Sequence, residues 1–322
     1  MKKVTVIGGG TGTFVVLSGL KKYPLDLGVI VTMMDSGGST GRLRDQLGVL
    51  PPGDLRQCLV ALSEAPLFWR KLLLYRFESG DLAGHNFGNL FLSALEKVCS
   101  SYSEVIETVS FVLKTKGQVI PVTFDKTNVC IQYKSGKIIK GEGNIEDNIN
   151  ESSPIAHAFL DPEAKPNNQA LKRIKDSDVL IIGPGDLYTS IIPILLVNEI
   201  KQAILASKAK IVFIMNLMTK SGQTNNFTAQ DHLHHLEKYL GKQPDVIISQ
   251  LGQIPGEIQQ WYQEHNENVV ENNLVKNGFK GKIIEANIID TNRFGGGAAD
   301  QLTRSILRHD SEKLAKLIST II

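Results

Sequence analysis

Cysteine, aromatic residues and long apolar runs are scarce in this sequence, and two of these scarcities limit the class of protein. Cys58, Cys99 and Cys130 stand apart without C-x-x-C spacing, which fits a reducing compartment better than a disulfide scaffold. No run approaches the ~18 apolar residues that a membrane helix needs. The apolar run after Met1 covers only residues 4–7 and breaks into glycines, unlike a secretory signal. We therefore expect a cytoplasmic protein with no membrane insertion.

Excess charge is also missing. The 35 basic and 33 acidic residues give a net charge of +2, so the whole chain has no electrostatic preference for nucleic acid, and any anion site must be local. With 42% apolar residues in 322, the chain can bury a full core. We expect a single α/β domain over residues 1–322.

The most unusual stretch is residues 32–56, which is rich in glycine, arginine and aspartate and has almost no apolar face. Lacking periodic apolar positions, it is predicted to form a long loop. Its amides, hydroxyls and guanidinium groups suit phosphate, and a solvated flexible loop is the alternative. The candidate ligand-binding residues here are Asp35, Gly37, Gly38, Ser39, Thr40, Arg42, Arg44 and Arg56.

A second glycine-rich segment follows the first β-branched run, residues 4–7, and precedes a helical stretch with Leu17 and Leu20. A further apolar strand over residues 27–32 completes a βαβ unit, so both glycine-rich segments face one crevice at the carboxyl ends of the strands. Amides at a helix start form an anion site. The candidates in this segment are Gly9, Gly10, Thr11, Gly12 and Thr13.

An NAD-dependent oxidoreductase is an alternative, because Gly8-x-Gly10 precedes Asp35 by about the spacing of a ribose-binding carboxylate. Thr13 occupies the third position of that fingerprint instead of glycine. The match is therefore imperfect.

The rest of the chain predicts one doubly wound, mostly parallel sheet (Rossmann-like) with two additions. Apolar periodicity predicts a helical insertion over residues 54–116, and alternating residues predict a small β meander over 117–150. Polar residues over 142–153 predict a linker that overlaps the end of this meander. The βα pattern then resumes with strands near 178–182, 210–215, 245–248 and 282–288. A capping box at Thr228 opens a helix. A glycine-rich loop with Arg293 and a last helix over 298–307 close the pattern.

Other polar residues could serve the same crevice. His85, Asn86 and Asn89 surround a helix start and offer hydrogen bonds to a base, sugar or phosphate. Asp35, Asp54 and Asp186 could bind magnesium beside phosphate oxygens, with helix capping as the alternative for Asp54. There is no G-x-S-x-G nucleophile elbow.

Six stretches together resemble the bacterial gluconeogenesis factor family, which is related to the 2-phospho-L-lactate transferases. They span nearly the whole chain and cover residues 6–12, 35–44, 50–56, 84–90, 183–193 and 216–219. The resemblance implies a UDP-sugar-binding regulatory protein required for gluconeogenic growth and cell shape. A ligand diphosphate would meet Gly9 to Thr13 and the loop from Gly37 to Arg44.

The resemblance also implies that the pocket is completed by His85, Asn86, Asn89 and the turn from Gly183 to Tyr188, which includes Gly185 and Asp186. The alternative is a magnesium-dependent, 2-phospholactate-type transferase that uses a nucleotide diphosphate donor. Ser36 stands where the family often has a second aspartate, which weakens a catalytic metal site at Asp35. Homo-oligomers and regulatory protein partners stay open.

Overall fold

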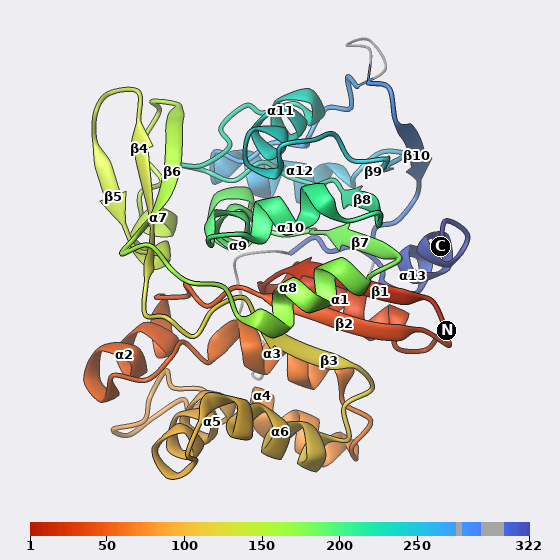
Figure 1. Cartoon of the computed structure of the whole chain (residues 1–322). Helices are drawn as coiled ribbons and strands as arrows, with labels where there is room; N and C mark the ends of the chain where they lie inside the picture. Colours follow the sequence, from red (N-terminus) through yellow and green to blue (C-terminus); the bar gives the residue numbers. More distant parts are fainter. Residues whose placement is uncertain (275–278, 291–305) are drawn as a thin grey trace.

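A computed structural model describes residues 1–274, 279–290 and 306–322, and within these ranges the main sheet has seven strands, all paired in parallel. The prediction of a doubly wound sheet is confirmed (Figure 1). The strands run in the order β10-β9-β8-β7-β1-β2-β3. Their bounds are β1 (Lys3–Gly8), β2 (Asp26–Val31), β3 (Gln118–Pro121), β7 (Val179–Ile182), β8 (Lys210–Ile214), β9 (Val246–Gln250) and β10 (Lys282–Ala286).

Helices cover both faces of this sheet, and the central strands are accordingly apolar and buried along almost their whole length. One face carries α1 (Gly10–Leu20), α3 (Gly53–Leu62) and α13 (Ser311–Ser319). The other carries α8 (Asn168–Asp176), α9 (Ile192–Leu196), α10 (Ile200–Ala206) and α11 (Ala229–Leu240). The predicted helical insertion consists of α3 and three further helices that pack against α3, namely α4 (Leu67–Leu74), α5 (Phe87–Val98) and α6 (Tyr102–Leu113).

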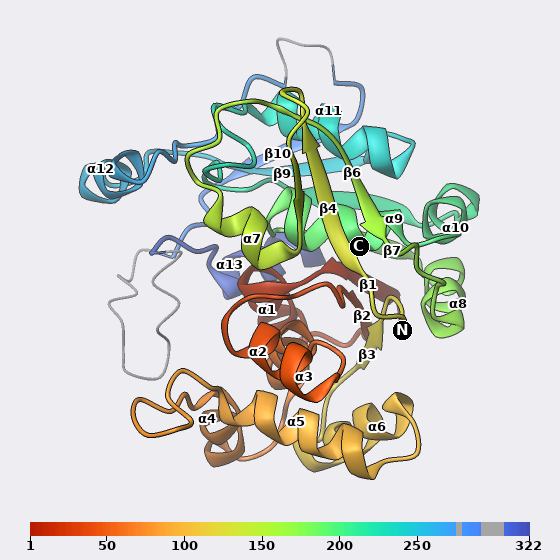
Figure 2. The ribbon, with the colours of Figure 1, turned by 90° about the vertical axis from the view of Figure 1, so that its left-hand side faces the viewer.

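The predicted β meander divides between two sheets. β3 pairs in parallel with β2 at the edge of the main sheet, whereas β4 (Asn128–Tyr133), β5 (Ile138–Lys140) and β6 (Ile155–Asp161) form a separate antiparallel sheet. The predicted linker contains α7 (Glu142–Asp147) and leads into β6. Figure 2 shows this small sheet and α7 together on one side of the molecule. Local alternation predicted β3, β4 and β5, but it predicted neither β6 nor the sheet to which each strand belongs.

The predicted long loop was wrong in its central part. Residues 32–37 have no helix or strand, but α2 (Gly38–Leu47) follows and ends at Gly48, which has a φ of 64°. Small residues let this helix pack closely: a Cβ at Gly41 would lie 2.1 Å from the Ser36 carbonyl oxygen. Tertiary packing against α5 therefore stabilises a helix that has no apolar stripe.

Other expectations had mixed outcomes. The capping box is present, with Thr228 and Asp231 exchanging both hydrogen bonds. The run after β7 starts with a π-helical turn, η1 (Leu187–Ile191). The sequence did not predict α12 (Gly256–Glu264) or α13. Arg293 and most of the predicted helix over 298–307 lie outside the described residues.

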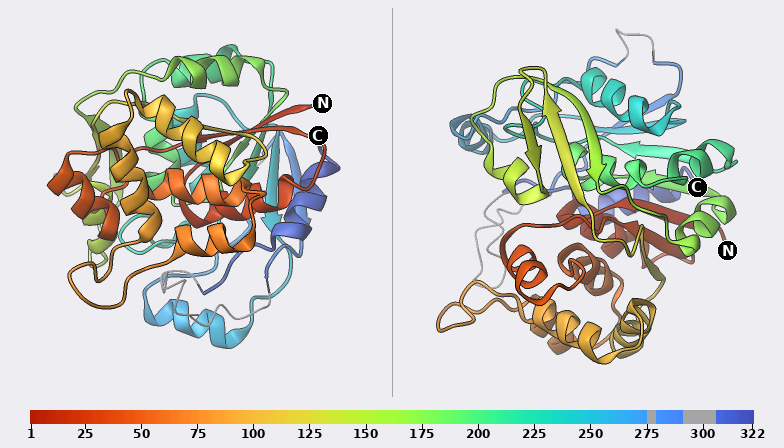
Figure 3. Two further views of the ribbon diagram at one scale, coloured as in Figure 1. Left: turned by 90° about the horizontal axis from the view of Figure 1, so that it is seen from below. Right: turned by 60° about the vertical axis from the view of Figure 1, so that its left-hand side comes forward.

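Among the described residues, no single helix is both long and apolar enough to cross a bilayer, although the bent pair Leu187–Leu196 and Ile200–Ala206 passes by length and composition. The two chain termini lie near one another in both views of Figure 3.

A buried arginine ties the amino ends of β1 and β2 to α8. Arg173 donates from Nε to Thr5 Oγ1 (2.8 Å), from Nη1 to Asp26 Oδ1 (2.7 Å) and from Nη2 to the Val4 carbonyl (3.2 Å). A methyl group on Gly28 would lie 2.7 Å from Nε. Arg173 therefore takes the space that glycine leaves beside the sheet.

We predict that Arg173→Met lowers the free energy of unfolding by about 2–4 kcal/mol, because it removes charged hydrogen bonds to a carboxylate, a buried hydroxyl and a carbonyl. Lys3→Met is the matched control at the same end of the sheet. Its ion pair with Asp176 has side chains 40% and 39% exposed, so a change below about 1 kcal/mol is expected. Denaturant unfolding measures both, and equal effects would contradict the role given to Arg173.

Candidate functional site

A cleft of about 560 Å³ opens where the order of the strands reverses. The chain passes from β1 to β2 and β3 on one side, and from β7 to β8, β9 and β10 on the other. Loops that follow β1, β2, β7 and β8 line the cleft. Such a switch point at the carboxyl ends of parallel strands is the usual ligand site in open α/β sheets.

Three helices begin at this cleft. The N-cap residues of α1, α2 and α3 are Gly9, Gly37 and Pro52, and none of them caps its helix with a side-chain hydrogen bond. Residues in the first turn of each helix line the cleft. Backbone N–H groups and the positive ends of helix dipoles therefore favour an anion there.

Glycine brings the first turn of α1 against the loop that follows β7. A Cβ at Gly12 would lie 2.2 Å from the Pro184 carbonyl oxygen, and one at Gly9 would lie 2.3 Å from Asp54 Oδ2. Neither contact could accommodate a side chain without displacement of backbone or carboxylate. The glycine-rich segment thus gives close packing between α1, α3 and β7, in addition to exposed amides.

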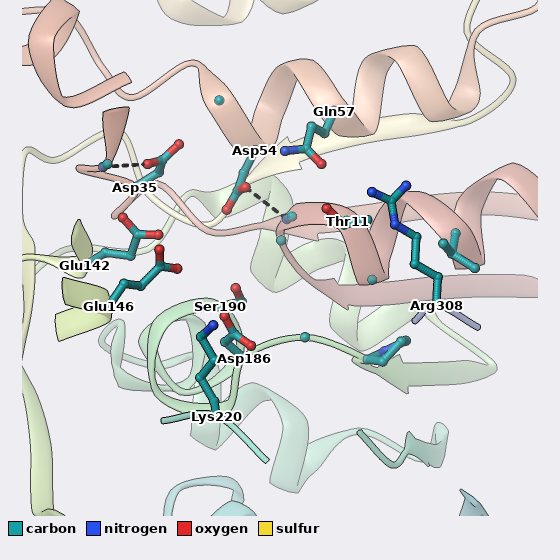
Figure 4. Close-up of a pocket in the computed structure, with 18 of the residues that line it drawn as sticks. Thr11, Asp35, Asp54, Gln57, Glu142, Glu146, Asp186, Ser190, Lys220 and Arg308 are labelled. Carbon is teal, nitrogen blue, oxygen red and sulfur yellow. Dashed lines mark hydrogen bonds between the residues drawn. The ribbon is translucent and has the colours of Figure 1, made fainter. Parts of the chain in front are cut away.

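Carboxylates face the same helix ends (Figure 4). Asp54 Oδ1 accepts a hydrogen bond from Gly10 N–H (2.9 Å), and Asp35 Oδ1 accepts one from Gly37 N–H (3.0 Å). Glu142 Oε2 accepts from Ser36 N–H (3.1 Å). Burial, together with the charges of Asp35 and Glu142, raises the pKa of Asp54 well above its usual value.

A second charged group lies beside the loops after β7 and β8. Lys220 Nζ lies 3.1 Å from Glu267 Oε1. Burial alone would lower the pKa of Lys220, but the carboxylates of Asp186 and Glu267 outweigh it and raise the pKa. Burial raises the pKa of Asp186, against the opposing effect of Lys220. Figure 4 shows Lys220, Asp186 and Ser190 close together.

The structure brings most sequence-predicted residues into this one cleft. Those that line it are Gly9, Gly10, Thr11, Gly12, Asp35, Gly37, Gly38, Ser39, Thr40, Arg56, Asn89, Gly185 and Asp186. Those that do not line it are Thr13, Arg42, Arg44, His85, Asn86 and Tyr188.

The two arginines on α2 point elsewhere. Arg42 is exposed and donates from Nη2 to the Ala83 carbonyl (3.0 Å), while Arg44 donates to Asn128 Oδ1. Tyr188 is fully buried, and its hydroxyl lies 2.5 Å from His235 Nδ1. Thr13 is likewise fully buried in α1. Residue type alone suggested phosphate contacts for these arginines, whereas helix geometry directs them away from the cleft.

His85 and Asn86 support the cleft from behind. Ser39 Oγ lies 3.2 Å from His85 Nδ1 and accepts a hydrogen bond from Asn86 N–H at 3.2 Å. Burial lowers the pKa of His85. Asn89, which lines the cleft, accepts a hydrogen bond from Arg56 Nε at 2.8 Å. This network fixes the first turn of α2 relative to α5.

Several residues that line the cleft were not predicted from the sequence. Glu142 and Glu146 lay in the predicted linker. Their spacing of four residues, which would place both on one face of a helix, was the only sign in the sequence that they act together. The remaining missed residues that matter below are Lys220, Tyr262, Glu267, Arg308 and His309, and all of them line the cleft. They come from loops and elements far apart in sequence, so no local pattern connects them.

Magnesium fits this cleft only as an ion shared with a ligand. No group of three or more His, Cys, Asp or Glu residues in the described part of the chain is placed to hold a metal ion by itself. Asp35, Asp54 and Glu142 nevertheless present hard oxygen donors beside the helix ends. Magnesium commonly takes one or two protein carboxylates together with phosphate oxygens.

Comparison with known proteins places this geometry in a family. Residues 4–289 match the family described as 2-phospho-L-lactate transferase CofD. The chain belongs to the CofD family. The crystal structure of a UPF0052 family protein from Bacillus halodurans has a TM-score of 0.90 and 35% identity, covering 99% of this chain and 98% of that one.

Curated relatives of this CofD family member are named gluconeogenesis factors. The Bacillus subtilis gluconeogenesis factor is 35% identical over 98% of this chain and 96% of its own length. A Thermoanaerobacterium thermosulfurigenes protein, which carries that name provisionally, is 42% identical over 98% of this chain and 95% of its own length.

We predict that Asp54→Asn raises the melting temperature at pH 7. The raised pKa means that ionising Asp54 costs folding free energy, and this cost appears as the pH rises from about 4, the unfolded value, to the folded value. An asparagine oxygen can still accept the Gly10 hydrogen bond. The gain should therefore vanish below about pH 4.

Asp45→Asn on the exposed face of α2 is the control, because it removes the same charge without this burial. Thermal unfolding across a pH series measures both variants. A less stable Asp54→Asn protein at pH 7 would contradict the electrostatic origin of the shift.

Proposed function

We propose that this chain is a cytoplasmic regulatory protein that binds a UDP-sugar, such as UDP-N-acetylglucosamine, in the cleft, and that it supports gluconeogenic growth and cell shape. The observation that carries the proposal is the convergence of three helix N-termini, none capped by its N-cap side chain, on the cleft at the switch point. The names of the relatives support the gluconeogenic role.

Magnitudes favour a ligand with two phosphates. One helix N-terminus contributes about 0.3–1 kcal/mol toward an anion, whereas micromolar binding needs about 8 kcal/mol. Charged hydrogen bonds add about 1.5–3 kcal/mol each. Several helix ends together with Lys220 and Arg308 can reach this figure for a diphosphate, which spans more than one helix end.

The acidic lining opposes a bare diphosphate. The cleft is lined by six acidic and four basic side chains among the described residues: Asp35, Asp54, Glu142, Glu146, Asp186 and Glu267, and Arg56, Arg76, Lys220 and Arg308. A magnesium ion held by Asp35 and Glu142 would neutralise charge between these carboxylates and the phosphates. The amides of α1 and α2 would then orient the ligand.

A magnesium-dependent transferase is the second candidate, because the family match is to a phospholactate transferase and because carboxylates surround the helix ends. In that reaction the chain would use its amides and cations to stabilise developing phosphate charge. Ser36, in place of a second aspartate, leaves one carboxylate fewer at this position. The NAD alternative has no support from the family match.

The first test is calorimetric titration with UDP-N-acetylglucosamine, GDP and NAD, each with and without magnesium. We expect micromolar or tighter binding of the UDP-sugar and at least tenfold weaker binding of GDP and NAD. Selection of GDP, or turnover with an alcohol acceptor, would favour the transferase. Failure of all three ligands to bind would contradict the proposal.

A matched pair of arginine variants tests the location. Arg308 lines the cleft, and Figure 4 shows its side chain near Gln57 and Thr11. Arg308→Gln should weaken UDP-sugar binding about tenfold, the loss of one charged hydrogen bond. Arg42→Gln should leave binding unchanged, because Arg42 bonds to Ala83 outside the cleft. The opposite result would place the phosphates on the exposed side of α2.

A further inference from the structure

The wall of the cleft opposite α2 is less acidic and rests on a small apolar cluster. Leu217, Tyr262 and Leu307 belong to this cluster and also line the cleft. They come from the segment after β8, from α12 and from the segment before α13. This wall therefore has a packed apolar base beneath a few polar atoms, as ligand sites commonly have.

His309 offers the first of these polar atoms. Its side chain is only 7% exposed and lines the cleft. One ring nitrogen is hydrogen-bonded to the Met215 backbone, whereas Nε2 has no hydrogen-bond partner in the part of the chain that the structure describes. Met215 N–H already donates to the Ile248 carbonyl at 2.9 Å, so the ring donates to the Met215 carbonyl, which leaves Nε2 as the acceptor of the neutral ring.

The charge state of His309 agrees with this geometry. Burial lowers its pKa to about 4, despite the opposing hydrogen bond to Met215. The ring is therefore neutral near pH 7, and Nε2 is a poor proton acceptor but a good hydrogen-bond acceptor. This favours recognition of a donor group over general-base chemistry.

Asn216, the neighbour of Met215, offers the second atom. Its Nδ2 donates to the Gly185 carbonyl at 2.9 Å, which fixes the orientation of the amide. Asn216 also lines the cleft, and its Oδ1 is buried with no hydrogen-bond partner from the described residues. A buried acceptor without a partner costs about 1–3 kcal/mol.

We propose that His309 Nε2 and Asn216 Oδ1 together form a subsite that accepts hydrogen bonds from hydroxyl groups on a sugar ring of the ligand. The inference rests on the proposed function and assigns the sugar to the wall opposite the α2 phosphate donors. Two buried acceptor atoms favour hydroxyl groups as their partners, and they disfavour a phosphate or carboxylate in direct contact with them. The sugar is either the ribose or the hexose of the nucleotide sugar.

The experiment compares His309→Phe with His309→Gln, which keeps a side-chain acceptor near the position of Nε2. Titrants are UDP-N-acetylglucosamine, UDP, 2′,3′-dideoxy-UDP and magnesium pyrophosphate. For His309→Phe we expect at least tenfold weaker binding of UDP-N-acetylglucosamine and an unchanged affinity for magnesium pyrophosphate. His309→Gln should recover part of the loss, and the melting temperature of each variant shows whether the fold is retained.

The ligand series identifies the sugar. If the subsite binds the ribose, wild-type protein should bind the dideoxy analogue about as weakly as His309→Phe binds UDP. If the subsite binds the hexose, UDP and its dideoxy analogue should bind wild-type protein with the same affinity, and His309→Phe should weaken the binding of the UDP-sugar only. Either pattern supports the subsite.

Two other outcomes overturn it. An unchanged UDP-sugar affinity in His309→Phe, or an equal loss for pyrophosphate, would remove the inference and leave the proposed function standing. Wild-type protein that binds none of the four titrants would remove the proposed function and the inference together.

Discussion

The close approach of α1 to the loop after β7 is the constraint on which the cleft depends. A Cβ at Gly12 would clash with the Pro184 carbonyl, and because glycine has none, the first turn of α1 packs against the loop that follows β7. β1 and β7 are paired neighbours at this point, and the chain runs from them towards opposite edges of the sheet. Strand order thus creates the crevice, and glycine lets backbone amides form one of its walls.

Opposed charges then define what the cleft can bind. Helix N-termini favour anions, yet Asp54 and Asp35 already accept hydrogen bonds from the first turns of α1 and α2. These carboxylates satisfy the N–H groups at an electrostatic cost, which agrees with the raised pKa of Asp54. An anionic ligand must compete with them or share a cation with them.

The two walls differ in chemistry because they come from different parts of the fold. The first turns of α1, α2 and α3 bring backbone N–H groups to one wall, whereas the other wall carries acceptor atoms of Asn216 and His309 that have no partner among the described residues. The family match and the fold shared with the Bacillus halodurans protein both extend across the whole sheet.

The sequence by itself determined the βαβ start and the parallel core strands, because apolar periodicity and turn chemistry are local. Residue chemistry and the family resemblance together named thirteen candidate residues that line the cleft. Only the tertiary structure decided the rest. Gly38–Leu47 is a helix because α5 packs against it, and this helix directs Arg42 and Arg44 away from the cleft. Asn216 and His309 are almost a hundred residues apart. They meet at Met215 because sheet order, which no local pattern encodes, brings the chain's last segment to the end of β8.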